Sequence, residues 1–124
     1  MVTHKVLKTS DYYISQIRNF LENKGYDVDG PVELFGKSGN FHTIDIMIID
    51  SKNRTFMGKY ILSGAFIDEE IIFRIFGISF DMDVDGVFLF VLPQLTVRAV
   101  ELADFYGFKV IDVSNLKNLS RIQE

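Results

Sequence analysis

Apolar side chains recur at helical spacing in three segments of the chain, so that each predicted helix has one apolar side. Glycines follow the first and third segments, at Gly25 and Gly107, where a helix ends most readily. Thr9 or Ser10 is a candidate N-cap of the first helix. The predicted helices span residues 10–24, 66–80 and 95–106.

Five further segments are typical of β-strands. Ile44, Ile46 and Ile48 have the alternation of a strand with one buried face, whereas residues 87–92 form the continuous apolar run of a strand covered on both faces. Turn-forming residues fill positions 36–40 and 50–54, so we expect antiparallel hairpins between the first three strands. The predicted strands span residues 26–35, which Asp-Gly-Pro at 29–31 interrupts, and 41–49, 55–62, 87–92 and 108–113.

The order of these elements indicates an α/β fold. It reads helix, three-strand meander, helix, strand, helix, strand. Because one helix joins the last two strands, we expect them to be parallel neighbours with a right-handed crossover. The sequence therefore predicts a mixed sheet with an antiparallel three-strand meander, a final αβ unit and helices on its faces.

Composition narrows the class of protein. A chain of 124 residues with 48% apolar residues and two prolines has the size and the core-forming groups of a single domain, residues 1–124. The absence of cysteine excludes disulfides, a thiolate nucleophile, a zinc ribbon and iron–sulfur clusters. The longest apolar runs have about seven residues, against the ~20 of a membrane span, and the polar start lacks the apolar region of a signal peptide. We expect a soluble cytoplasmic protein with no membrane partner.

Charge is unevenly distributed along the chain. The net charge is −4, but residues 36–63 carry +2, from four basic and two acidic groups, and residues 64–112 carry −6, from three basic and nine acidic groups. Surface charge that serves solubility explains such an asymmetry, and so does a locally basic face that contacts phosphate. On the second interpretation, the candidate DNA-binding residues are Lys37, His42, Lys52 and Arg54.

Two short motifs imitate ligand-binding loops. Gly36-Lys37-Ser38 resembles the end of a phosphate-binding loop, but Pro31 stands where that motif needs its first glycine, and a strand rather than a helix follows. The segment Asp81–Gly86 opens like a calcium loop, yet its twelfth position is Leu92 rather than a bidentate glutamate. We interpret this segment as a polar helix-to-strand turn, with a weak calcium site as the alternative.

Asp45 is the residue most in need of explanation, because a carboxylate within an apolar strand costs free energy unless it is paired or hydrogen-bonded. If paired positions in the 50–54 hairpin sum to 105 or 106, Asp45 lies opposite Tyr60 or Ile61, with Lys59 as its near neighbour. Two interpretations remain open. The Asp45–Lys59 pair either sets the strand register or belongs to a site that cleaves phosphodiesters.

The element order, the Gly39-x-x-His42-x-x-Asp45 entry into the second strand, and the closing pattern over residues 87–112 together resemble the PD-(D/E)XK restriction-endonuclease-like superfamily. This superfamily includes type IV restriction nucleases and archaeal Holliday-junction resolvases. The resemblance covers about residues 10–113 and implies an αβββαβ core. It also implies a site in which an acid on the second strand and an acid-x-Lys motif on the third bind Mg²⁺ and orient a water molecule toward the scissile phosphate.

Carried over by residue, the resemblance makes Asp45 the first acid and a metal ligand, and Lys59 the lysine. Met57 stands at the position of the second acid, and a thioether does not replace a carboxylate as a ligand of Mg²⁺. Glu33 is a candidate displaced acid, whereas Glu22, near the end of the first helix, has no assigned role. The resemblance therefore implies a degenerate site, with no cofactor if inactive and Mg²⁺ if active.

Three functions follow as expectations. The first is a non-catalytic nuclease-like domain that binds DNA or another protein. The second is a Mg²⁺-dependent endonuclease or resolvase that acts on branched or damaged DNA through Asp45, Glu33 and Lys59. The third is a structural dimerisation domain, for which exposed members of the twelve phenylalanines supply the interface of a homodimer.

Overall fold

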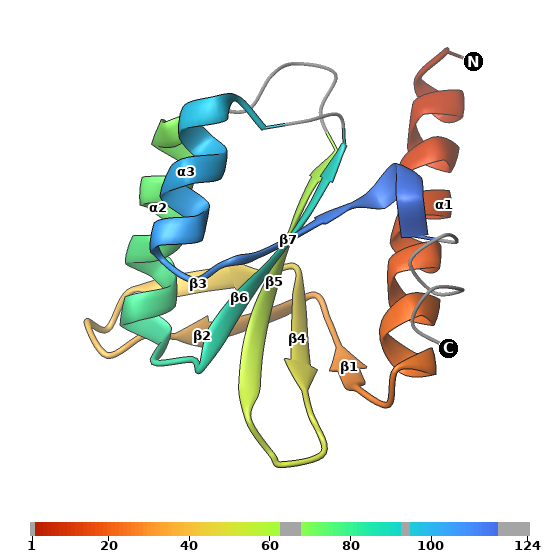
Figure 1. Ribbon diagram of the computed structural model, residues 1–124. Coiled ribbons are helices and arrows are strands. Elements are labelled where there is room, and N and C mark those ends of the chain that lie inside the picture. The colour runs from red at the N-terminus through yellow and green to blue at the C-terminus, as the bar shows by residue number, and fades with distance from the viewer. Residues whose placement is uncertain (1, 63–67, 93–94, 117–124) are drawn as a thin grey trace.

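The computed structural model describes residues 2–62, 68–92 and 95–116 (Figure 1). Its helices are α1 (Val2–Asn23), α2 (Glu69–Met82) and α3 (Val97–Phe105), with a short 3₁₀ turn η1 (Val113–Asn115). Its strands are β1 (Asp27–Asp29), β2 (Val32–Phe35), β3 (Phe41–Ile44), β4 (Ile46–Ile49), β5 (Thr55–Leu62), β6 (Gly86–Leu92) and β7 (Lys109–Asp112). Within the described ranges, no helix is long and apolar enough to cross a membrane.

The molecule has three layers, with a five-stranded sheet between α1 on one face and α2 with α3 on the other (Figure 1). The strand order is β1-β4-β5-β6-β7, with antiparallel pairs β1–β4 and β4–β5 and parallel pairs β5–β6 and β6–β7. Strands β2 and β3 form a separate antiparallel pair. The predicted α/β fold, the hairpins and the parallel final strands are confirmed.

Each face of the sheet buries its own apolar layer. On one face, Ile72 and Ile75 of α2 and Ala99 and Ala103 of α3 are buried against the sheet. On the other, Ile17 and Leu21 of α1 pack on the side chains of β4 and β6. The helical spacing of these residues is the signal from which the helices are predicted.

Two predicted strands are each divided in the structure. Residues 26–35 become β1 and β2, and residues 41–49 become β3 and β4 with Asp45 at the break. Gly30 has a φ of +151°, and a Cβ atom there would lie 2.5 Å from the carbonyl oxygen of Asp45, so the two breaks cross in close contact. The chain bends at this crossing, and the β2–β3 pair leaves the main sheet.

The predicted hairpin register is wrong by one residue. Ile46 pairs with Gly58 and Ile49 with Thr55, so paired positions sum to 104. The turn is the reason, because the Asp50 carboxylate accepts hydrogen bonds from the backbone N–H groups of Lys52 and Arg54 and holds a three-residue loop. Continued by one step, this register brings Asp45 opposite Lys59 rather than opposite Tyr60 or Ile61.

The helix boundaries also differ from those predicted. Helix α1 begins at Val2, so Thr9 and Ser10 lie inside it and the predicted cap is wrong. Asp68 caps α2 by accepting a hydrogen bond from the backbone N–H of Glu70, and α2 continues through Gly77 to Met82. Positions 66 and 67 of the predicted second helix lie outside the described residues. Local spacing predicts that a helix forms, whereas its ends depend on which neighbouring groups satisfy the backbone.

Candidate functional site

Asp45 lies between β3 and β4, beside Lys59 of β5. The Lys59 Nζ atom is 3.4 Å from Asp45 Oδ2, and the backbone N–H of Tyr60 donates a hydrogen bond of 2.9 Å to the same oxygen. The Asp45 side chain is 24% exposed and that of Lys59 39%. The carboxylate predicted to need compensation therefore has both a cation and a backbone donor.

Met57 precedes Lys59 by two residues and so projects from the same face of β5. It is 3% exposed and belongs to the apolar layer under α2 and α3. A thioether buried in this layer supplies no oxygen ligand, so β5 brings an amine but no carboxylate to Asp45.

Glu33 and Glu22 are not among the recorded hydrogen-bond or ion-pair partners of Asp45 and Lys59. Glu33 is exposed on β2, where it pairs with Thr43, and the structure records no hydrogen bond or ion pair between Glu33 and Asp45. Glu22 belongs to α1, which covers the opposite face of the sheet. Among the described residues, no three His, Asp or Glu side chains form a group that could hold a metal ion. This donor set does not fit Mg²⁺.

A second polar cluster joins residues far apart in the sequence. His42 Nε2 lies 2.6 Å from Asp81 Oδ2, and Asp81 accepts hydrogen bonds of 2.7 Å from both the backbone N–H and the hydroxyl of Ser38. Gly36 leaves room for this carboxylate, because a Cβ atom there would overlap it. The cluster fastens the tip of the β2–β3 hairpin to the last turn of α2.

These hydrogen bonds, first from His42 and then from Ser38, hold the pKa of Asp81 at about 2, well below its ordinary 3.8. His42 and Asp81 belong to separate sequence motifs, 39 positions apart, and no spacing along the chain connects them. Only the packing of the β2–β3 hairpin on α2 brings the side chains of His42 and Asp81 together, so the sequence alone does not predict their contact.

The other carboxylates of the calcium-like segment have structural contacts of their own. Asp83 ends α2 with a φ of +58°, and its carboxylate lies 3.9 Å from the Nζ atom of Lys37. Asp85 accepts a hydrogen bond of 2.8 Å from the backbone N–H of Thr55. The predicted helix-to-strand turn is present between Met82 and Gly86.

Three of the candidate DNA-binding residues lie on two separate turns, and the fourth, His42, lies in β3. Lys37, on the β2–β3 turn, is 3.9 Å from Asp83 and lies over the ring of Phe80, with 4.7 Å from Nζ to the centroid. Arg54, on the β4–β5 turn, contacts Asp50 at 2.7 Å. With His42 bound to Asp81, three of the four candidates are paired with carboxylates.

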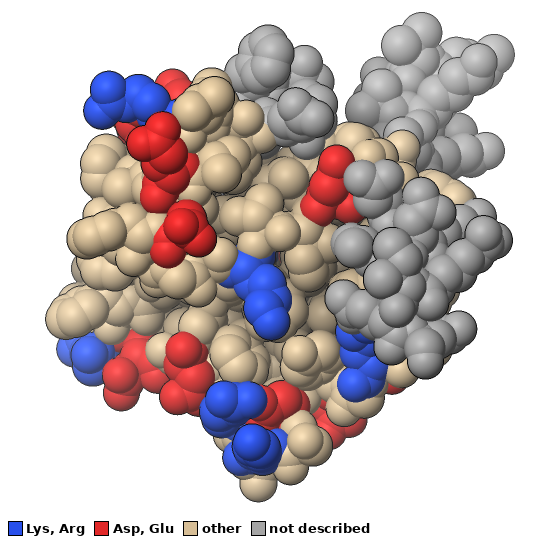
Figure 2. Space-filling view, viewed as in Figure 1, with Lys and Arg blue, Asp and Glu red and all other residues tan. Residues whose placement is uncertain are grey.

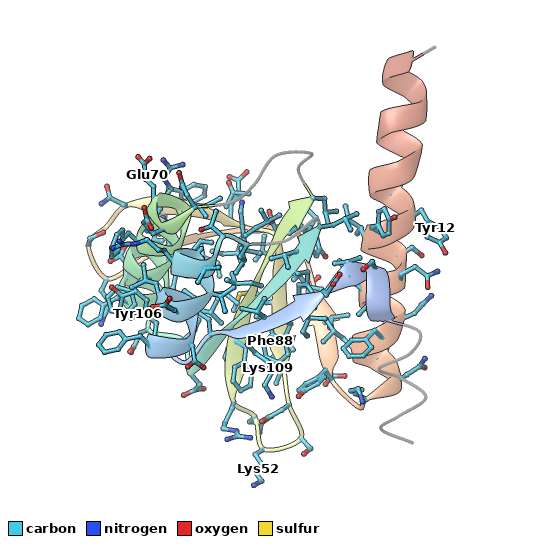
Figure 3. All side chains as sticks on the ribbon, turned by 45° about the horizontal axis from the view of Figure 1, so that its top comes forward. Tyr12, Lys52, Glu70, Phe88, Tyr106 and Lys109 are labelled. Carbon is cyan, nitrogen blue, oxygen red and sulfur yellow. The ribbon has the colours of Figure 1, made fainter. Side chains whose placement is uncertain are left out.

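Lys52 is exposed at the tip of the β4–β5 turn (Figure 3). On the face shown in Figure 2, acidic and basic side chains are interspersed, and both signs meet around this end of the molecule.

No protein-family model matches this sequence, and a search of curated proteins finds no match either. Solved structures do match. AF1548, a protein of unknown function, superposes with a TM-score of 0.72 at 14% identity over 80% of this chain and 56% of its own. VC1899 from Vibrio cholerae gives a TM-score of 0.64 at 12% identity over 90% of this chain and 31% of its own.

A repair endonuclease from Pyrococcus abyssi gives a TM-score of 0.56 at 13% identity over 82% of this chain and 43% of its own. This chain therefore spans less than two thirds of each of these proteins. At such identities the likeness concerns the fold alone. The structure is a mixed α/β fold, which is consistent with the restriction-endonuclease-like core that the sequence resembles.

Proposed function

We propose that this chain is a non-catalytic nuclease-like domain that works as a protein-interaction module. The observation that carries the proposal is Met57, a buried thioether at the place where a cleaving site of this fold needs its second acid. Asp45 and Lys59 keep the geometry of an acid–lysine pair. Without a second carboxylate beside them, the pair neutralises itself instead of binding a hard cation.

Electrostatics favours a protein over DNA as the partner. The net charge is −4, and Lys37, His42 and Arg54 each lie beside a carboxylate. A cation that already faces a carboxylate gains little from a phosphate, because counterion release from DNA requires an excess of positive charge. Exposed aromatic side chains on α2 and α3 supply the apolar surface that protein partners use.

A cleavage assay tests the catalytic half of the proposal. Linear, branched and single-stranded DNA is incubated with the protein in Mg²⁺ and in Mn²⁺, alongside Asp45→Ala and a control variant, Glu22→Ala, whose exposed acid lies on α1. We expect no turnover above background for any of the three proteins. Turnover that is lost in Asp45→Ala and kept in Glu22→Ala overturns the proposal and favours a Mg²⁺-dependent nuclease with a displaced acid such as Glu33.

A further inference from the structure

The β2–β3 hairpin, residues 32–44 and here called the arm, leaves the main sheet and reaches the C-terminal end of α2 (Figure 1). The base of the arm is apolar, because Val32 and Ile44 are paired and pack against the apolar layer under α2 and α3. Within β2 and β3, Ile44 is the one buried residue. Nearer the tip, the side chains of Leu34, Phe35 and Phe41 are exposed. Little apolar burial therefore holds the arm on the molecule, which is the condition for local opening.

Polar contacts with α2 fasten the tip of the arm. The carboxylate of Asp81 accepts hydrogen bonds from the backbone N–H and the hydroxyl of Ser38, and it lies 2.6 Å from His42 Nε2. The backbone carbonyl of Asp81 accepts a further hydrogen bond of 2.8 Å from the backbone N–H of Lys37. Asp81 is therefore the main polar fastening of the tip.

Other contacts join the two strands of the arm to each other without help from α2. Phe35 and Phe41 are paired across the hairpin, and their rings meet edge to face with 4.6 Å between centroids. The backbone N–H of Gly36 donates a hydrogen bond of 2.8 Å to the carbonyl of Asn40. Because these contacts lie within the hairpin, they persist when the tip leaves the helix.

We propose that the arm is a lid over the C-terminal end of α2, latched by Asp81, that opens as one unit about the crossing of Gly30 and Asp45. Gly30 precedes β2 and Asp45 follows β3, so both strands of the arm join the rest of the chain at this crossing. The close approach of Gly30 to the carbonyl oxygen of Asp45 keeps the two connections together as a hinge.

Lys37 is the residue with which the lid covers the helix. Its ammonium lies 4.7 Å from the centroid of the Phe80 ring, and Lys37 lines a cavity of about 260 Å³ together with Phe76, Phe80 and Tyr106. Opening of the lid withdraws Lys37 from this cavity and uncovers the ring of Phe80.

Amide hydrogen exchange followed by NMR tests the lid in the wild-type chain. The Lys37 amide is bonded to α2, the Gly36 amide is bonded within the arm, and the Phe90 amide belongs to the buried strand β6. We expect Lys37 to be the least protected of the three, with exchange that is insensitive to low concentrations of urea, because opening the lid exposes little surface. Exchange of the Phe90 amide should accelerate with urea, since it requires global unfolding.

The variant Asp81→Asn tests the latch. It keeps the backbone carbonyl to which Lys37 donates, so faster exchange of the Lys37 amide reports opening of the lid and not a missing acceptor. Because hydrogen bonds to a charged group are lost, we expect this exchange to become about tenfold faster and to stay insensitive to urea. The control Asp27→Asn, which changes an exposed acid on β1, should leave the rate unchanged.

Equal protection and equal urea dependence of Lys37 and Phe90 would show that the arm opens only when the whole chain unfolds, and would overturn the lid. Equal protection of Gly36 and Lys37 would show that the hairpin itself comes apart, which contradicts opening as one unit. Exchange of Lys37 that is the same in Asp81→Asn and in the wild type would overturn Asp81 as the latch.

Discussion

At the scale of single residues, Asp45 shows how a carboxylate is kept inside a sheet. Asp45→Ala leaves both the backbone N–H of Tyr60 and the Lys59 ammonium without their acceptor, and we expect it to lower the free energy of unfolding by about 1–3 kcal/mol. Lys59→Met keeps the hydrogen bond from Tyr60 to Asp45 and the packing of the aliphatic part of the side chain, so we expect it to lower the free energy of unfolding by less than ~1 kcal/mol. Urea denaturation measures both, and the reverse order would show that Lys59 is the main partner.

Asp81 gives a prediction for the dependence of stability on pH. Because its pKa in the folded chain, about 2, is lower than the ordinary 3.8, ionised Asp81 stabilises the fold above about pH 4, and this contribution is lost as the pH falls toward 2. We therefore expect wild type to be more stable than Asp81→Asn at pH 5, with the difference vanishing toward pH 2. Chemical denaturation at a series of pH values measures it.

The control for this experiment is Asp27→Asn, which changes an exposed acid on β1. If the difference in the free energy of unfolding between wild type and Asp81→Asn persists unchanged at pH 2, the asparagine destabilises the fold through its shape and not through the lost charge. That result would contradict the prediction.

At the scale of elements, the same substitution should act oppositely in β5 and α2. Gly58→Ala places a methyl group against Ile46 in a buried strand, and overpacking of this kind costs about 1–3 kcal/mol. Gly77→Ala places a methyl group in open space on a helix and adds up to ~1 kcal/mol to the stability of the folded chain. Thermal denaturation in dilute solution compares the two, and a stabilising Gly58→Ala would contradict the tight packing of β5 on β4.

At the scale of the whole molecule, the pairing of basic side chains with carboxylates limits how strongly the surface attracts DNA. We expect fluorescence anisotropy to detect no salt-dependent binding of duplex or branched DNA, even at low ionic strength where phosphate contacts are strongest. The comparison protein is the triple variant Lys37→Gln, Lys52→Gln, Arg54→Gln. Binding by the wild type that weakens with salt, and a flatter salt dependence in the triple variant, would assign these residues to a DNA surface and contradict the preference for a protein partner.

Much of the architecture was predictable because it depends on local spacing. The apolar side of α1 and the continuous run of β6 identify those elements from a few neighbouring residues. The contact between Asp45 and Lys59 was also predictable. An unpaired carboxylate in an apolar strand requires a partner, and Lys59 lies near Asp45 even if the hairpin register shifts by one residue.

By itself, the sequence determined which segments form helices and strands, the parallel joining of the last two strands, and the presence of Met57, not an acid, two residues before Lys59. These follow from the period of side chains along one element and from the chemistry of Met57. Only the tertiary structure decided the one-residue register of the β4–β5 hairpin, the break at Asp45 and the contact of His42 with Asp81. Those features depend on close approach between backbone segments distant in sequence, which no spacing along the chain records.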